Sequence, residues 1–333
     1  MRKIIDINPH SATPKYRQIV LSVEMAIAEN RLGKNERLPS VNKISLAFGL
    51  SRDTVLQAYD ELKKRGIIYA VPGKGYYVKS TEFSFEQRIF LLFDELNAFK
   101  EEIYNSFLQT MDGRAQVDIF FHHFNPDMFR KLIHESNGNY SKYIVMPTNL
   151  AGAAAAIKTL PAQDVFVLDQ TNADLQNYPS VHQQFADDMY AALVKAKPLL
   201  EKYRQLVLVF PGQKEPVAMV EGFNRFCSEQ AFPSEIINGF DEASITIGSV
   251  FIVPSDTHLV NVIEQARRQE LAIGKDFGII SYNDIPLKKV VENGITTIST
   301  DFQAMGHTLA QMVLGNVKVQ IKNPSDLIVR RSL

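Results

Sequence analysis

Beyond residue 86, the sequence alternates between short apolar runs and longer stretches in which apolar residues recur at helical spacing. The apolar runs, each the length of a buried strand, occupy residues 88–93, 117–122, 143–146, 165–168, 206–210, 249–253 and 278–282. The helical patterns between them occupy residues 98–111, 127–134, 151–159, 185–195, 219–230 and 259–268. Because such alternation is typical of parallel sheets with helices on both faces, we predict an α/β fold. Sheets of this kind bind ligands beyond the carboxyl ends of their strands.

The charge of the chain is divided unevenly, although the formal net charge is only −1. Residues 1–80 hold 14 Lys and Arg against 7 Asp and Glu, which leaves 22 basic and 30 acidic side chains for the rest of the chain. A basic segment joined to a larger acidic one suggests that the first part faces a polyanion. The length of 333 residues fits two domains, and we place them at 1–80 and 87–333, with a polar linker at 81–86.

Cysteine content and hydropathy indicate the compartment. The single cysteine, Cys227, excludes an intrachain disulfide and suggests a reducing environment. The first residues lead into no long apolar stretch, and no run of about eighteen apolar residues occurs in the sequence. We therefore expect a cytoplasmic protein with no membrane partner.

The basic segment contains the signals of three helices and a β-hairpin. The expected helices cover about residues 14–30, 41–48 and 52–65, and two β-rich runs flank a turn at Pro72–Gly75. Ser40 and Ser51 directly precede the second and third helices and are placed to cap them. Together these elements predict a winged helix-turn-helix, whose third helix has the size that fits the major groove of DNA.

Four motifs in this segment resemble, in order and spacing, those of the GntR family of bacterial transcription regulators: Arg37–Ser40, Gly49–Val55, Gly66–Ile68 and Gly73–Gly75. The resemblance implies that operator DNA is contacted by Arg37, Ser40, Ser51, Arg52, Thr54, Gly73, Lys74 and Gly75. Asn42 is a further candidate, at a position where the family often has arginine; it can hydrogen-bond to DNA but neutralises no phosphate charge. Outside this motif, Ser51 would be interpreted only as a helix cap and Arg52 as a solvated residue.

Several runs in the acidic part resemble the effector-binding domain of the LacI repressor family, which is similar to periplasmic sugar-binding proteins. These runs are Ile144–Pro147, Phe166–Asp169, Glu221–Phe223 (expected at a helix start), Ser281–Pro286, Thr296–Gly306 and Leu327–Ser332. The resemblance spans about residues 86–333 and implies two lobes joined by three crossovers, with a cleft between them. It also implies that the protein is a homodimer.

By the same position-matching, the cleft would be lined by Asp94, Asn97, Phe99, Asp169, Met219, Asp256 and Asn283. Carboxylates and amides hydrogen-bond to pairs of hydroxyl groups, and an aromatic face covers the apolar side of a sugar ring. Met219 and Gln170 stand where sugar-binding relatives often have arginine, which favours a neutral effector and leaves room for an apolar patch. Capping of loops or helices is the alternative role for the aspartates, and core packing is the alternative for Phe99.

These features together predict a bacterial transcription regulator, most simply a repressor of carbohydrate catabolism, with a monosaccharide effector. No phosphate-binding loop, H-E-x-x-H or G-x-S-x-G motif is present, so we expect no enzyme activity, no cofactor and no metal site. His122 and His123 are adjacent on an expected strand and point to opposite faces, and Cys227 is expected to be a buried structural thiol. Two alternatives stay open: a sugar-handling enzyme with a DNA-binding appendage, and a regulator with a nucleobase or nucleoside effector.

Overall fold

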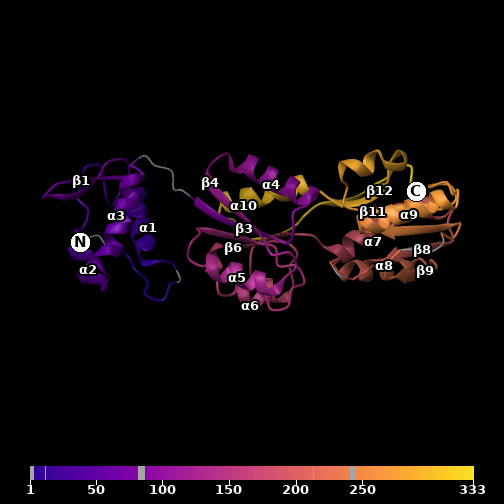
Figure 1. Cartoon of the computed structure of the whole chain (residues 1–333), viewed down its shortest axis with the longest axis horizontal. Helices are drawn as coiled ribbons and strands as arrows, with labels where there is room; N and C mark the ends of the chain where they lie inside the picture. Colours follow the sequence, from indigo (N-terminus) through magenta and orange to yellow (C-terminus); the bar gives the residue numbers. More distant parts are fainter. Residues whose placement is uncertain (1–3, 12, 82–86, 213, 241–244) are drawn as a thin grey trace.

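A computed structural model describes residues 4–11, 13–81, 87–212, 214–240 and 245–333, so most of the expected linker at 81–86 lies outside the described residues. Three bodies follow one another along the longest axis of the molecule (Figure 1). They are a small N-terminal domain, a first α/β lobe and a second α/β lobe, and the two chain ends lie on the first and last of them.

The N-terminal domain has the three helices and the hairpin expected from the sequence. Its elements are α1 (Lys15–Ala28), α2 (Val41–Phe48), α3 (Arg52–Lys64), β1 (Ile68–Val71) and β2 (Gly75–Val78), with the two strands antiparallel. Gly49 ends α2 in a left-handed conformation at φ 65°, which glycine adopts without steric cost. Val55, Tyr59 and Leu62 share the inner face of α3 and pack into the core of the domain. The winged helix-turn-helix prediction is confirmed.

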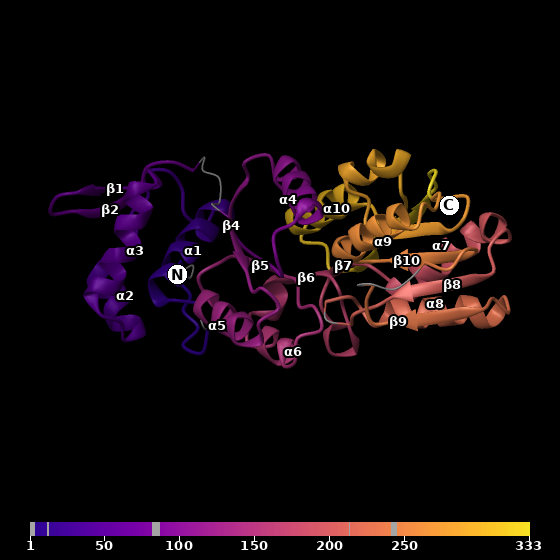
Figure 2. The ribbon, with the colours of Figure 1, turned by 45° about the vertical axis from the view of Figure 1, so that its right-hand side comes forward.

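The first lobe is a six-stranded parallel sheet in the order β13-β7-β6-β5-β3-β4. Its strands are β3 (Gln87–Phe93), β4 (Ala115–Phe121), β5 (Lys142–Val145), β6 (Val165–Asp169), β7 (Ser180–His182) and β13 (Gln320–Lys322). One face is covered by α4 (Ala98–Met111) and α10 (Phe302–Leu314), and the other by α5 (Pro126–Ser136) and α6 (Ala153–Ile157) (Figure 2). Successive residues of β3 enter the two cores in turn, since side chains alternate along a strand.

The second lobe repeats this plan with the strand order β14-β12-β11-β10-β8-β9. Its strands are β8 (Gln205–Val209), β9 (Ser234–Ile237), β10 (Ser249–Val253), β11 (Gly278–Tyr282), β12 (Thr296–Thr300) and the antiparallel β14 (Ser325–Ile328). α7 (Phe185–Leu200) and α8 (Ala218–Glu229) cover one face, and α9 (Asp256–Arg268) covers the other. Short 3-10 turns occur at η1 (Ala162–Asp164), η2 (Ala173–Leu175), η3 (Pro286–Lys289) and η4 (Val291–Asn293). The predicted two-lobed α/β fold is confirmed.

The chain passes between the lobes three times: after β7, between β12 and α10, and between β13 and β14. Asn323, in the third crossover, joins all three. Its backbone N–H donates to the carbonyl oxygen of His182 (2.8 Å), and its side-chain Nδ2 donates to the carbonyl oxygen of Asp301 (2.8 Å). Because Asn323 is only 1% exposed, these hydrogen bonds join the crossovers inside a buried junction.

α8 begins at Ala218, so Glu221 lies in its first turn, as expected for a helix start. Gly222 also marks the place where α8 crosses α7, because a Cβ there would lie 2.1 Å from the backbone oxygen of Ala186. One expectation about local structure was wrong. β4 ends at Phe121, so His122 and His123 follow the strand and do not belong to it. His122 is nevertheless buried and His123 exposed, and Cys227 is a buried thiol as expected.

Strands β7, β9, β12, β13 and β14 and helix α10 were not anticipated as elements, since most are short or lack a clear period. No helix in the described part of the chain combines the length and hydropathy that a membrane span requires.

The crossing of α7 and α8 predicts the effect of a single methyl group. Gly222→Ala forces the new Cβ against the Ala186 carbonyl and should lower the free energy of unfolding by about 2–3 kcal/mol. Urea denaturation followed by circular dichroism measures this loss. Asn224→Ala, at an exposed position of the same helix, is the matched control and should unfold like the wild type. Equal stability of both variants would contradict the close packing of the two helices.

His122 predicts a pH dependence of stability. Burial lowers the pKa of His122 from 6.5 to about 4, although its Nε2–H donates to the carbonyl oxygen of Met146 (3.1 Å). The folded state therefore stays unprotonated where the unfolded chain takes up a proton. Stability from this group is complete above pH 6.5 and is lost as the pH falls toward 4, by up to about 3 kcal/mol.

Denaturation at pH 7 and pH 4.5 checks the contribution of His122. His122→Gln should show a shallower loss of stability between these values, while His123→Gln, at the exposed neighbour, should retain the wild-type profile. An unchanged profile in His122→Gln would show that other groups cause the pH dependence.

Candidate functional site

Ser40 and Ser51 begin the two helices of the helix-turn-helix as caps. The hydroxyl oxygen of Ser40 accepts from the backbone N–H of Lys43 (3.2 Å). Ser51 accepts from the backbone N–H of Thr54 (3.1 Å), and the two hydroxyl groups lie 2.8 Å apart. Capping fixes the first turn of each helix, where free backbone N–H groups and the helix dipole favour an anion such as phosphate. Whether these side chains also contact DNA stays a prediction.

Three of the predicted DNA-binding side chains are exposed cations: Arg37, Arg52 and Lys74. None of the three makes an ion pair with another residue that the structure describes. The backbone of Arg37 pairs with that of Tyr77 of β2 in an isolated antiparallel β-bridge. A Cβ on Gly75 would lie 3.3 Å from the Arg37 side chain. The Arg37 guanidinium therefore lies against the hairpin.

The remaining predicted contacts occupy the same small domain. Asn42 is exposed in the first turn of α2. Gly73 and Gly75 adopt φ values of 72° and 114°, which turn the hairpin tip and expose Lys74. Tyr76 packs edge-on against Tyr59 in the core (4.7 Å between ring centres).

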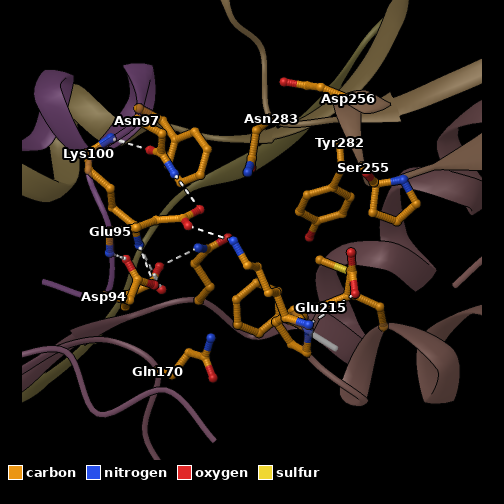
Figure 3. Close-up of a pocket in the computed structure, with 18 of the residues that line it drawn as sticks. Asp94, Glu95, Asn97, Lys100, Gln170, Glu215, Ser255, Asp256, Tyr282 and Asn283 are labelled. Atoms are coloured by element: carbon orange, nitrogen blue, oxygen red, sulfur yellow. Dashed lines mark hydrogen bonds and ion pairs between the residues drawn. The ribbon is translucent and has the colours of Figure 1, made fainter. Parts of the chain in front are cut away.

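A cavity of about 340 Å³ lies between the two lobes, at the carboxyl ends of strands from both sheets. Its lining contains every residue that the sequence placed there, namely Asp94, Asn97, Phe99, Asp169, Met219, Asp256 and Asn283. In Figure 3, Asp94, Asn97 and Lys100 of the first lobe face Tyr282 and Asp256 of the second. The structure thus brings the predicted residues together, and their binding of a ligand stays a prediction.

A buried lysine joins two carboxylates on the first-lobe side of the cavity. Lys100 Nζ lies 3.4 Å from Asp94 and 3.4 Å from Asp169, and its side chain is 3% exposed. Burial lowers the pKa of Lys100, but the two carboxylates outweigh burial and the net shift is upward. Burial raises the pKa of Asp94 in spite of the nearby ammonium group. A charged lysine held this way fixes the positions of both carboxylates, whose residues line the cavity.

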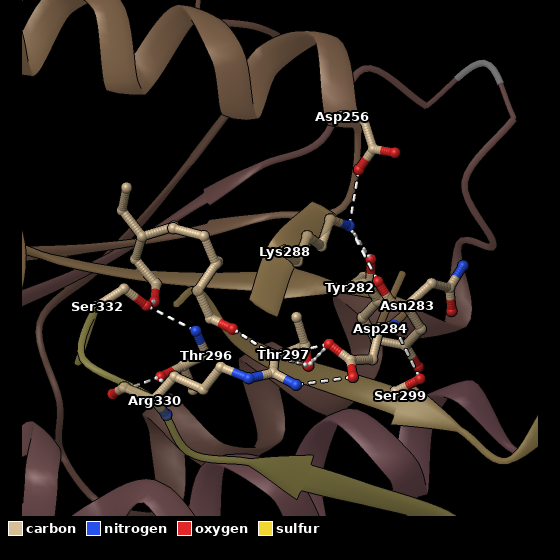
Figure 4. Close-up of polar contacts among 12 residues, drawn as sticks. Asp256, Tyr282, Asn283, Asp284, Lys288, Thr296, Thr297, Ser299, Arg330 and Ser332 are labelled. Atoms are coloured by element: carbon tan, nitrogen blue, oxygen red, sulfur yellow. Dashed lines mark hydrogen bonds and ion pairs between the residues drawn. The ribbon is translucent and has the colours of Figure 1, made fainter. Parts of the chain in front are cut away.

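The two other lysines of the lining are also paired. Lys288 Nζ lies 2.7 Å from Asp256 and donates to the carbonyl oxygens of Tyr282 and Asn283 (2.7 and 3.0 Å; Figure 4). Burial lowers the pKa of Lys288 despite Asp256. Lys214, which follows β8 of the second lobe, lies 2.7 Å from Glu95 of the first lobe. This pair therefore spans the cavity from one lobe to the other.

Side-chain contacts fix the loop after β11, which contains Asn283. The carboxylate of Asp284 receives two hydrogen bonds from the guanidinium of Arg330 (2.6 and 2.8 Å; Figure 4). Burial alone would raise the pKa of Asp284, but the hydrogen bonds and charge of Arg330 lower it. Asn283 and Asp169 both have left-handed backbone, with φ 61° and 71°, which is uncommon for residues other than glycine and often found at functional sites.

The apolar lining belongs partly to the protein core. Phe99 stacks on Phe302 (4.9 Å between ring centres), packs against the core and also lines the cavity, and its contact with a ligand stays a prediction. Met219 is 4% exposed and packs into the core of the second lobe. Asn97 caps α4 by accepting from the backbone N–H of Lys100 (3.1 Å). Asp94 Oδ1 accepts from the N–H of Glu95 (2.7 Å), as a loop cap would.

Sequence reasoning missed several lining residues, above all Lys100, Gln183, Lys214, Tyr282 and Lys288. The lysines had no signal, because a lysine on a helix or loop is ordinarily solvated. Tyr282 ends a strand that was predicted, and its position directly before Asn283 was the one indication in the sequence that it lines the cavity.

Two parts of the chain match known families. Residues 15–78 match the bacterial regulatory proteins of the gntR family, and residues 200–333 match the periplasmic binding protein-like domain. The arabinose metabolism transcriptional repressor of Geobacillus stearothermophilus is 20% identical and aligns over 96% of each chain. The HTH-type transcriptional repressor YtrA of Bacillus subtilis is 33% identical over 75 residues. That match covers 22% of this chain and 58% of the relative, and an uncharacterised regulator of the same organism, YcxD, is covered over only 14% of its length.

Solved structures share the fold of the lobes. A LacI family transcriptional regulator from Silicibacter pomeroyi superposes with a TM-score of 0.62 at 14% identity, over 74% of this chain and 98% of that one. At this identity the likeness shows the fold alone. The chain therefore joins a GntR-family helix-turn-helix domain to a periplasmic binding protein-like domain with the LacI-type fold.

Proposed function

We propose that this protein is a transcription regulator that binds operator DNA through its N-terminal domain and responds to a small neutral effector in the interlobe cavity. One observation carries the proposal: a GntR-family helix-turn-helix and a cavity between two α/β lobes occur in the same chain. The division into a DNA-binding domain at 1–80, a linker at 81–86 and an effector domain at 87–333 is part of this proposal.

DNA recognition is assigned to the exposed side chains at the start of α3 and in the wing. Arg52 is in the first turn of α3, which the helix-turn-helix geometry brings to the base edges, and an arginine there can bind guanine. Lys74 and Arg37 add positive charge for the phosphates. The capping serines Ser40 and Ser51, with Asn42 and Thr54, complete the proposed contacts.

The charges of the cavity favour a neutral effector. Five carboxylates line it, on Asp94, Glu95, Asp169, Glu215 and Asp256, against three ammonium groups. Each ammonium group is already paired with a carboxylate, so an anionic ligand would find no free cation among the described lining residues. Hydroxyl groups, in contrast, can donate to the carboxylates, and Phe99 and Met219 can cover an apolar ring face.

Similar proteins support a sugar as the effector. The relative aligned over the whole chain is a repressor of arabinose metabolism, and a structural neighbour from Enterococcus faecium, with a TM-score of 0.59, has ribose bound. We therefore assign the effector to the monosaccharides and the regulated genes to carbohydrate catabolism.

Repression and dimerisation complete the proposal. Structural neighbours include a dimeric Lac repressor, with a TM-score of 0.61. A dimer of this chain would bring two α3 helices onto one face of the DNA, about one helical turn apart. An effector that bridges the lobes would shift the equilibrium between their open and closed arrangements, and thereby change the spacing of the two DNA-binding domains.

The role of Arg52 can be tested directly. Arg52→Ala should weaken operator binding about tenfold or more, because a base contact is lost, while effector binding is kept. Mobility-shift titrations at one fixed salt concentration measure the first property, and calorimetry measures the second. Lys158→Ala, which removes an exposed positive charge from the first lobe, is the control and should bind the operator like the wild type. Unchanged affinity in Arg52→Ala would count against the assigned DNA-binding face.

The effector class can be tested by calorimetric titration with arabinose, ribose, galactose and fucose beside their phosphorylated or acidic derivatives. Neutral sugars should bind and raise the melting temperature, because a ligand that binds only the folded state stabilises it. Binding of sugar phosphates or sugar acids alone would overturn the neutral-effector proposal. Preference for adenosine over every sugar would point to a nucleoside effector.

A further inference from the structure

Three buried polar atoms without a partner belong to residues that line the cavity. Among the described residues, the hydroxyl of Tyr282, Oε1 of Gln183 and Oδ1 of Asn283 are buried and have no hydrogen-bond partner in the protein. All three residues line the interlobe cavity. Leaving a buried polar group without a partner costs about 1–3 kcal/mol, so such groups at a cavity indicate a ligand that supplies the missing partners.

The orientation of Gln183 is fixed by its other contacts. Its side-chain Nε2 donates to Asp169 Oδ1 (2.6 Å), and its backbone N–H donates to the Asp169 carbonyl oxygen (2.9 Å). Oε1 is therefore left as a pure acceptor, in a residue that is 9% exposed. Gln183 lies in the first crossover, directly after β7, so this acceptor belongs to the hinge of the two lobes.

Tyr282 contributes its hydroxyl from the second lobe. The residue is the last of β11, its ring packs into the core of the second lobe, and it is 2% exposed. In Figure 3 its hydroxyl points away from its strand, into the group of lining side chains. Burial raises the pKa of Tyr282 well above its usual value, so the hydroxyl stays protonated and can both donate and accept.

We propose that Tyr282 and Gln183 determine the specificity of the cavity, by binding an effector that donates one hydroxyl to Gln183 Oε1 and hydrogen-bonds through another to the Tyr282 hydroxyl. This rests on the proposed function and adds the ligand feature that the site selects. A single ligand joined to both residues connects the hinge with the second lobe, so the hydrogen bonds that select the ligand also favour one arrangement of the lobes.

Tyr203 provides a matched control for Tyr282. It is a second tyrosine of the same core cluster, 6% exposed, and its hydroxyl likewise has no partner among the described residues, but it does not line the cavity. Tyr203→Phe and Tyr282→Phe therefore remove the same kind of buried hydroxyl. Neither should lower the melting temperature of the ligand-free protein, because no hydrogen bond inside the protein is lost.

The two variants should differ in ligand binding. With the full-length protein and the panel of neutral monosaccharides and adenosine as probes, Tyr282→Phe should weaken binding of the best probe about three- to tenfold. Tyr203→Phe should bind that probe like the wild type. Equal affinity in Tyr282→Phe and the wild type would overturn the assignment of Tyr282.

The stability measurement decides the case in which no probe binds. A failure of every probe would contradict the proposed effector class, whereas a melting temperature lower in Tyr282→Phe than in Tyr203→Phe would show a structural hydroxyl and overturn the inference.

Gln183→Met tests the other residue: it should lower the melting temperature, because Asp169 loses a donor, and also weaken binding of the best probe. Wild-type affinity in Gln183→Met would remove Gln183 from the proposal.

Discussion

The ion triad of Asp94, Lys100 and Asp169 is the interaction on which the cavity depends. A buried ammonium group is tolerable only when carboxylates surround it, and breaking such a pair is far more costly than never burying it. The triad connects the end of β3 with the first turn of α4 and the end of β6. Asp169 in turn accepts a hydrogen bond from the side chain of Gln183 in the first crossover. The chemistry of the cavity and the geometry of the hinge are therefore parts of one hydrogen-bonded network.

The second lobe reaches the cavity through a different arrangement. There, Arg330 clamps Asp284 and Lys288 binds the carbonyl oxygens of two successive residues, so the loop after β11 is fixed by side chains from outside the strand. Both lobes thus present charged groups that neutralise one another, and the second lobe adds Tyr282 and Asn283. Lys214 and Glu95 form an ion pair between the two lobes.

The features predicted from the sequence depend on neighbouring residues, and those that were missed depend on distant parts of the chain. The caps Ser40 and Ser51, the turn at Gly73–Gly75 and the alternation of buried strands with helices each leave a pattern within a few residues, and the structure confirms them. The burial of Lys100 results from carboxylates that are six and 69 positions away, and no local pattern encodes it. Gly222 was noticed as part of a motif at a helix start, but the close approach of α7 that requires a glycine there was not predicted.

The crossovers also govern the order in which the molecule can be completed. The first lobe takes α10 and β13 from residues 302–322, after the chain has already built nearly all of the second lobe. During synthesis, the apolar surface that α10 covers, around Leu91 of β3 and Phe107 of α4, must remain without its final partner until those residues have left the ribosome. The second lobe is complete in all but β14 by then, so the two lobes mature almost together although one begins about a hundred residues earlier.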